Sequence, residues 1–235
     1  MKTKSLTLIL TLSAAFLAGS ASLDAKSDET PVLAQYYTHS TATPVGTDAD
    51  GFIQRWTILE PIAIEAPSNR IFNDTYLRNA VYETEFFEDQ LSLLPTDGQK
   101  TKVGKERHVW HSLDAKNFYV NLLRFAEGYG KEYYGQVYWV VTTVNCEEDI
   151  ENVRLSCGVN SAAMWWLNGE EVLMMSNDRD LVVDDNMSDR ITLRKGENIL
   201  RGAVFNGPGM ATFCLRFVDE DGQPVKNISI TTKQK

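Results

Sequence analysis

The segment 158–175, which reads GVNSAAMWWLNGEEVLMM, constrains the fold more than any other part of this sequence. Asn168 and Gly169 can both take the positive φ values of a two-residue type I′ turn, and apolar runs flank them on both sides. The pattern therefore predicts a β-hairpin with its tip at these two residues. In the preceding run AAMWWL every side chain is apolar, so both faces of that strand are apolar. One of the two faces must be covered by another layer or must bind a ligand.

The first 51 residues carry the signals of an exported protein. Residues 1–21 combine a charged start, an apolar stretch and a small-residue end at Gly19-Ser20-Ala21, which is typical of a cleaved signal peptide. We expect a periplasmic or secreted protein without a membrane anchor. Ser20 stands where a lipid anchor would need cysteine, and no later stretch has the roughly 18 apolar residues of a membrane span. Residues 22–51 lack periodicity and predict a linker or loosely ordered arm.

The charge of the chain argues against nucleic acid as a partner. The chain has 23 basic and 32 acidic residues and a formal net charge of −9, and loss of residues 1–21 would make it −11, because that segment holds two lysines and no acid. Proteins that bind phosphate backbones need clustered lysine and arginine, whereas most basic residues here stand singly among acids.

The residues from Phe52 to Lys235 predict one all-β domain. Segments of alternating or continuous apolar residues, separated by turn signals such as Lys195-Gly196, follow one another at the spacing of a β-sandwich. We expect Tyr119–Phe125 to be one of these strands, Tyr76–Leu94 to mix a helical turn with a strand, and no long helix. Trp56 and Trp110 lie in alternating apolar segments and are expected in the core.

The three cysteines are an odd number for an oxidising compartment. If any pair forms a disulfide, the alternation of the strands favours Cys146 with Cys157, but free buried cysteine is common and the sequence gives no Cα separation. Their spacing is not that of a zinc site, because no second cysteine or histidine follows within two to four residues.

The order of the motifs resembles a known group of modules. The succession RWTILEPI, LLPTDGQKTKVG, HVWHSL, YGQVYWVVTTV, RLSCGVNSAAMWWLNGEEV, NDRDLVVDD, ITLRKGENILRGAV and FCLRFVDEDG is similar to the galactose-binding-like jelly-roll modules of bacterial carbohydrate-active proteins. Within them it most resembles the non-catalytic modules beside acetyl xylan esterases of Bacteroidetes-type systems. The resemblance implies a two-sheet antiparallel jelly roll and a link to xylan. The chain departs from such modules at Glu60-Pro61-Ile62, where they commonly have Gly-Pro-Phe, and at Asn160-Ser161, where they often have two acids.

Two places combine aromatic and polar side chains as sugar binding requires. Aromatic rings stack on the apolar face of a pyranose, and planar polar groups fix its hydroxyls. One place is the glycine-bounded loop 128–135, which reads GYGKEYYG, together with the segment 206–210, which reads NGPGM and could lie near the loop. The other place is Trp166 beside the hairpin tip. Packing in the core or at strand ends is the alternative for each of these residues. The candidate carbohydrate-binding residues are Tyr129, Tyr133, Tyr134, Trp166 and Asn206.

The sequence offers little to a catalytic reading. No G-x-S-x-G nucleophile elbow is present in the sequence after residue 21, and His108 and His111 flank Val109-Trp110 on a strand where packing or surface roles are expected. Asp184-Asp185-Asn186 could contribute oxygen ligands to calcium, or form a solvated turn. No other cofactor is predicted.

We therefore expect a non-catalytic, exported sandwich that binds plant cell-wall polysaccharide, with xylan as the implied class. The alternative is a structural module that packs against an esterase or glycosidase domain without touching sugar. An enzyme with an unrecognised site is the third reading.

Overall fold

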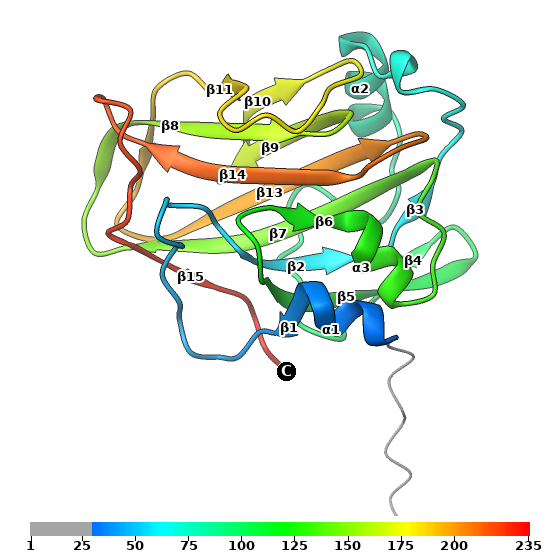
Figure 1. The fold of residues 1–235 in the computed structure, drawn as a ribbon, viewed down its shortest axis with the longest axis horizontal. Coiled ribbons are helices and arrows are strands. Elements are labelled where there is room, and N and C mark those ends of the chain that lie inside the picture. Colours follow the sequence, from blue (N-terminus) through cyan, green and yellow to red (C-terminus); the bar gives the residue numbers. More distant parts are fainter. Residues whose placement is uncertain (1–29) are drawn as a thin grey trace, which may run out of the picture.

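The computed structural model describes residues 30–235, which form a sandwich of two antiparallel sheets with an additional layer on one outer face (Figure 1). The predicted signal peptide and residues 22–29 lie outside the described residues. The predicted two-sheet antiparallel architecture is confirmed by the strand pairing.

The larger sheet has the strand order β1-β5-β2-β7-β13-β9-β10. Strand β3 and β15 pair with β7, and β4 pairs with β5. The bounds are β1 Tyr37–His39, β2 Arg55–Leu59, β3 Ile62–Ala63, β4 Lys100–Val103, β5 Glu106–Ala115, β7 Gln136–Cys146, β9 Ala162–Leu167, β10 Glu170–Met175, β13 Gly196–Asn206 and β15 Ile228–Thr231.

The smaller sheet has the order β11-β8-β14-β6, with β12 paired to β8. The bounds are β6 Val120–Asn121, β8 Ile150–Val159, β11 Asn186–Met187, β12 Ile191–Leu193 and β14 Thr212–Val218. The helices are α1 Pro31–Tyr36, the 3₁₀ turn η1 Asn69–Ile71, α2 Asp74–Tyr82 and α3 Leu122–Gly128.

The hairpin predicted at Asn168-Gly169 is confirmed. It joins β9 to β10, with φ of 53° at Asn168 and 88° at Gly169. The two apolar faces of β9 enter two different cores. Trp165 lies between the two sheets with Trp56 and Phe213, whereas Trp166 lies in a second core on the other face of the larger sheet. Both faces of β9 are therefore covered by protein.

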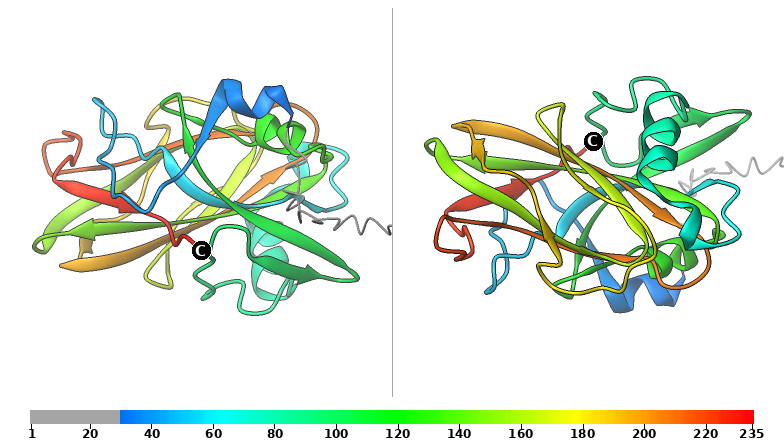
Figure 2. Two further views of the ribbon diagram at one scale, coloured as in Figure 1. Left: turned by 90° about the horizontal axis from the view of Figure 1, so that it is seen from below. Right: turned by 90° about the horizontal axis from the view of Figure 1, so that it is seen from above.

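The second core explains why this sheet is apolar on both sides. Residues 64–99, which include η1 and α2, pack over the face of the larger sheet opposite the smaller sheet (Figure 2). Asn73 begins α2 by accepting a hydrogen bond from the amide of Tyr76, and Leu77 and Val81 bury the helix against the sheet. The segment Tyr76–Leu94, for which the sequence predicted a mixture of helical turn and strand, thus contributes part of α2 and no strand to this layer.

Residues 30–51 are not the loosely ordered arm that the sequence predicts. Leu33 of α1 packs against Gly128 of α3, and Tyr37 of β1 donates its hydroxyl to the carbonyl of Asn121 at 2.6 Å. The buried guanidinium of Arg55 donates to the carbonyls of Thr41 and Thr43. Because these contacts satisfy backbone groups that a free linker would leave to water, the segment belongs to the domain.

One further expectation is wrong, and the open question of the cysteines is answered. The segment Tyr119–Phe125 is the short β6 followed by helix α3, which begins after Asn121 accepts a hydrogen bond from the amide of Arg124. The three cysteines are free and buried, so Cys146 and Cys157 are not bridged. No helix within residues 30–235 is long and apolar enough to cross a membrane.

Candidate functional site

The predicted aromatic loop presents one ring to solvent. Tyr134 is 54% exposed, and Tyr133 beside it is half-buried, with the two rings edge to face at 4.6 Å between centroids. Tyr129 is buried, and its ring stacks on His111 at 3.8 Å. The structure therefore corrects the prediction for Tyr129, because the residue is only 7% exposed and has no ring face left to stack on a sugar.

Trp166 and Asn206 are also buried and cannot contact a ligand directly. Trp166 stacks on Trp139 at 6.0 Å between centroids, and its indole nitrogen donates to the Tyr82 hydroxyl at 3.1 Å beneath α2. The Asn206 amide donates to the carbonyl of Tyr133 at 3.2 Å. The structure thus brings Asn206 to the aromatic loop as expected, but the buried Asn206 side chain holds the main chain of the loop at Tyr133 and does not face solvent.

A cleft of about 440 Å³ lies between β3, the start of β5 and the loop after α3. Most of the residues that line it are polar, with Pro61, Ile62, Ala63 and Val103 adding apolar surface, and we call it the Glu60 cleft after its most buried charged residue. The polar residues of its lining are Glu60, Glu106, Arg107, His108, Lys131, Glu132 and Gln136. Acids and bases of this lining are nearly balanced in number, so the cleft has no strong preference for an anion or a cation.

Glu60 is held in one position by contacts from two parts of the chain, strand β5 and the loop after α3. Its Oε2 atom accepts a hydrogen bond from the amide of Val109 at 3.1 Å and lies 3.2 Å from the Lys131 ammonium, and its Oε1 atom lies 3.5 Å from His111 Nε2. Burial raises the pKa of Glu60, but the interactions with His111, Val109 and Lys131 outweigh burial and hold the pKa below its usual range. The carboxylate is therefore charged and preoriented.

The surrounding packing fixes His111. Its imidazole is stacked on Tyr129 and meets the ring of Phe125 edge to face, and both partners come from the α3 region. His108, on the same strand, contacts the carbonyl of Glu60 at 3.2 Å through Nδ1. Both histidines were expected in packing or surface roles, and His111 does pack on Tyr129. His111 also lies beside the carboxylate of Glu60, a residue that the sequence analysis did not select, whereas His108 contacts the main chain of Glu60.

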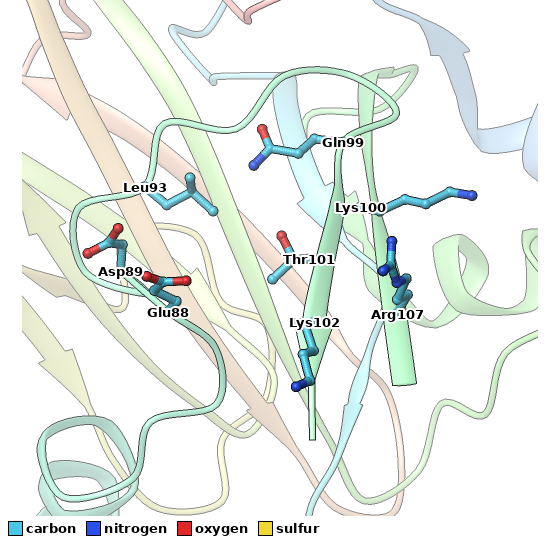
Figure 3. Close-up of a pocket in the computed structure, with 8 residues that line it drawn as sticks. All are labelled: Glu88, Asp89, Leu93, Gln99, Lys100, Thr101, Lys102 and Arg107. Atoms are coloured by element: carbon cyan, nitrogen blue, oxygen red, sulfur yellow. The ribbon is translucent and has the colours of Figure 1, made fainter. Parts of the chain in front are cut away.

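A second cleft of about 350 Å³ lies between the β4–β5 hairpin and the loop that carries Glu88 and Asp89, and we call it the hairpin cleft. Figure 3 shows Glu88 and Asp89 on a loop that faces Gln99 and Thr101 of the β4 segment. Lys100, Lys102 and Arg107 complete its polar lining. Arg107 lines both clefts, so the two are neighbours.

Asp184 and Asp185, for which the sequence left calcium binding open, form ion pairs with arginines. Asp184 accepts hydrogen bonds from Arg216 and Ser156, and Asp185 pairs with Arg179. Within residues 30–235, no group of three or more histidine, cysteine, aspartate or glutamate residues is arranged to hold a metal ion. Asp184 and Asp185 therefore hold the loop over the smaller sheet through their contacts with arginine and serine.

Comparison with known proteins gives only distant structural likeness. No family model matches the sequence, and no curated protein matches it. The PA14 domain of the antifreeze protein MpAFP is similar over 84% of this chain and 97% of its own, with 10% identity and a TM-score of 0.43. The A domain of a subtype-switched epithelial adhesin 9 from Candida glabrata, solved with β-lactose, is similar over 83% of this chain and 96% of its own, with 6% identity and a TM-score of 0.32.

A GH31 α-xylosidase from Xanthomonas citri is similar over 55% of this chain and 16% of its own length, with 10% identity and a TM-score of 0.28. Scores of this size give no information about what this chain binds. The sandwich assignment rests on the strand pairing described above.

Proposed function

We propose that this chain is a non-catalytic carbohydrate-binding module that takes a neutral segment of a plant cell-wall polysaccharide, of the xylan class, in the Glu60 cleft. The observation that carries the proposal is the fixed Glu60 carboxylate in a polar, nearly charge-balanced cleft of about 440 Å³, beside an exposed tyrosine. Sugar hydroxyls need such oriented acceptors and donors, and a volume of this size is in the usual range for small ligands.

The lining offers both kinds of hydrogen-bonding group. Glu60 and Glu132 provide acceptors, whereas Lys131 and His108 provide nitrogen atoms that can bind hydroxyl oxygens. Gln136 lines the cleft and donates through Nε2 to the carbonyl of Tyr134, which ties the cleft to the exposed ring. A pyranose in the cleft could extend toward Tyr134, whose ring offers an apolar face and whose hydroxyl can stay hydrated.

The test is a titration of the purified protein with xylan, mannan and cellulose fragments by affinity electrophoresis and calorimetry. One ring stacked on a sugar contributes on the order of 1 to 2 kcal/mol, so we expect roughly micromolar to millimolar binding that is little affected by salt. Tyr134→Ala should weaken it about tenfold. Phe118→Ala is the matched control, because Phe118 is also an exposed ring, at 39%, and lines neither cleft.

Absence of binding to every polysaccharide, or undiminished binding by Tyr134→Ala, would overturn the proposal. The alternative interpretation, that this chain is a structural module that packs against an esterase or glycosidase domain, would then be favoured. Turnover of a chromogenic acetyl ester by the purified protein would separately contradict the non-catalytic reading.

A further inference from the structure

The β4–β5 hairpin concentrates positive charge on a chain that is acidic as a whole. Lys100, Lys102, Lys105 and Arg107 are all exposed, and among residues 30–235 none of their side chains has an ion pair or hydrogen bond. Lys102 and Arg107 are directly opposite each other in the antiparallel register. Like charges at such positions destabilise a strand pair. With 32 acids available in the chain, this gathering of cations is not explained by the fold.

One wall of the hairpin cleft is a set of hydrogen-bond donors. Gln99 Oε1 accepts from the amide of Thr96 at 3.0 Å, and Thr101 Oγ1 accepts from the indole of Trp110 at 2.8 Å. These bonds occupy acceptor atoms and leave the Gln99 amide N–H groups and the Thr101 hydroxyl hydrogen as donors. Lys102 also lines this cleft, and its positive charge together with these donors matches an anionic oxygen group.

The opposite wall has the complementary character. Glu88 and Asp89 are exposed, and neither carboxylate has a hydrogen bond or ion pair within the described part of the chain. They offer only acceptors, so they would repel a simple anion such as sulfate and would bind hydroxyl groups. A ligand that satisfies both walls carries a carboxylate and hydroxyls on one ring, as a sugar acid does.

We propose that the hairpin cleft binds a uronic-acid residue of an acidic polysaccharide. Its carboxylate lies at the Gln99, Thr101 and Lys102 wall, and its hydroxyls face Glu88 and Asp89. The inference rests on the proposed glycan binding and specifies the class of glycan. Since Arg107 lines both clefts, a polysaccharide with a neutral backbone and acidic substituents would occupy the two clefts together.

The experiment compares glucuronic-acid-substituted xylan with its carboxyl-reduced form, which has the same backbone without the charge. At about 20 mM salt we expect the acidic form to bind about fivefold or more tightly, and the advantage to decline at about 500 mM, because the cations are exposed. Lys100→Gln with Lys102→Gln should remove the advantage and leave binding of the reduced form unchanged. Lys195→Gln with Lys226→Gln makes the same change of net charge away from both clefts and should keep the advantage.

The outcomes separate this inference from the proposed function. Equal affinity for the two xylans, or an advantage that survives Lys100→Gln with Lys102→Gln, overturns the uronic-acid site and leaves the Glu60 cleft proposal standing. Failure of both xylans to bind overturns both proposals. Competition by sodium sulfate as effective as by free glucuronate would show a simple anion site, and flotation with anionic vesicles would show a membrane-surface site; either result contradicts the inference.

Discussion

Replacing Glu60 by glutamine tests whether its carboxylate is held as the structure shows. Glutamine has the same shape, so the change removes charge without leaving a cavity. The Oε2 atom accepts from Val109 and Lys131, and hydrogen bonds to a charged group are worth about 1.5–3 kcal/mol against about 0.5–1.5 kcal/mol for neutral ones. Because Lys131 is 41% exposed, its interaction with Glu60 contributes stability at the low end of the range for charged hydrogen bonds. We expect a loss of roughly 1–3 kcal/mol, which corresponds to a melting temperature lower by roughly 3–10 °C.

The pH dependence provides a second readout. The pKa of Glu60 is lowered in the folded state, so its contribution is present above the pKa of the unfolded chain and is lost as pH falls through the folded pKa. The difference between the parent and Glu60→Gln should therefore be constant near neutral pH and shrink below about pH 4.5. Denaturant unfolding across pH measures it, with Glu132→Gln, an exposed acid of the same cleft, as the control. A difference below about 0.5 kcal/mol, or one that grows in acid, would refute the reasoning.

Two more predictions concern the core. Gly202→Ala should destabilise the protein by about 1–3 kcal/mol, because the new Cβ would lie 2.3 Å from the nearest ring carbon of fully buried Trp165. Gly104→Ala is the control, because its Cβ meets no atom within 4 Å and the change tests only backbone strain. Equal decreases in the melting temperature of the two variants would contradict this packing. Thiol titration should find no rapidly reacting cysteine in the native protein and three in denaturant without reductant; fewer than three would indicate a disulfide.

The hairpin and the sandwich could be predicted because their signals are local. Asn168-Gly169 specifies its turn within two residues, and Trp56 and Trp110 lie at fully buried positions as their alternation indicates. Helix α3 was missed, and α2 was predicted only as a helical turn, because their capping signals are single side chains. Asn73 and Asn121 each cap a helix of fewer than ten residues, and the apolar run after Asn121 is equally compatible with a strand.

The Glu60 cleft could not be predicted because its parts are distant in the sequence. Glu60 follows β2, His111 lies on β5, and Lys131 follows α3, and only the register of β2 with β5 and the packing of α3 bring them together. The aromatic loop was recognised, but composition does not tell which ring points outward. Tyr129 turns toward His111 and Tyr134 toward solvent, which is decided by tertiary packing.

The most direct test of the central claim is to map binding residue by residue with backbone amide chemical shifts during titration with a xylo-oligosaccharide. The account predicts saturable shifts concentrated at Val109, Lys131, Glu132 and Gln136, with the amide of Phe118 unchanged. Shifts confined to the surface around Phe118, or no shifts at millimolar ligand, about the weakest affinity expected, would contradict it.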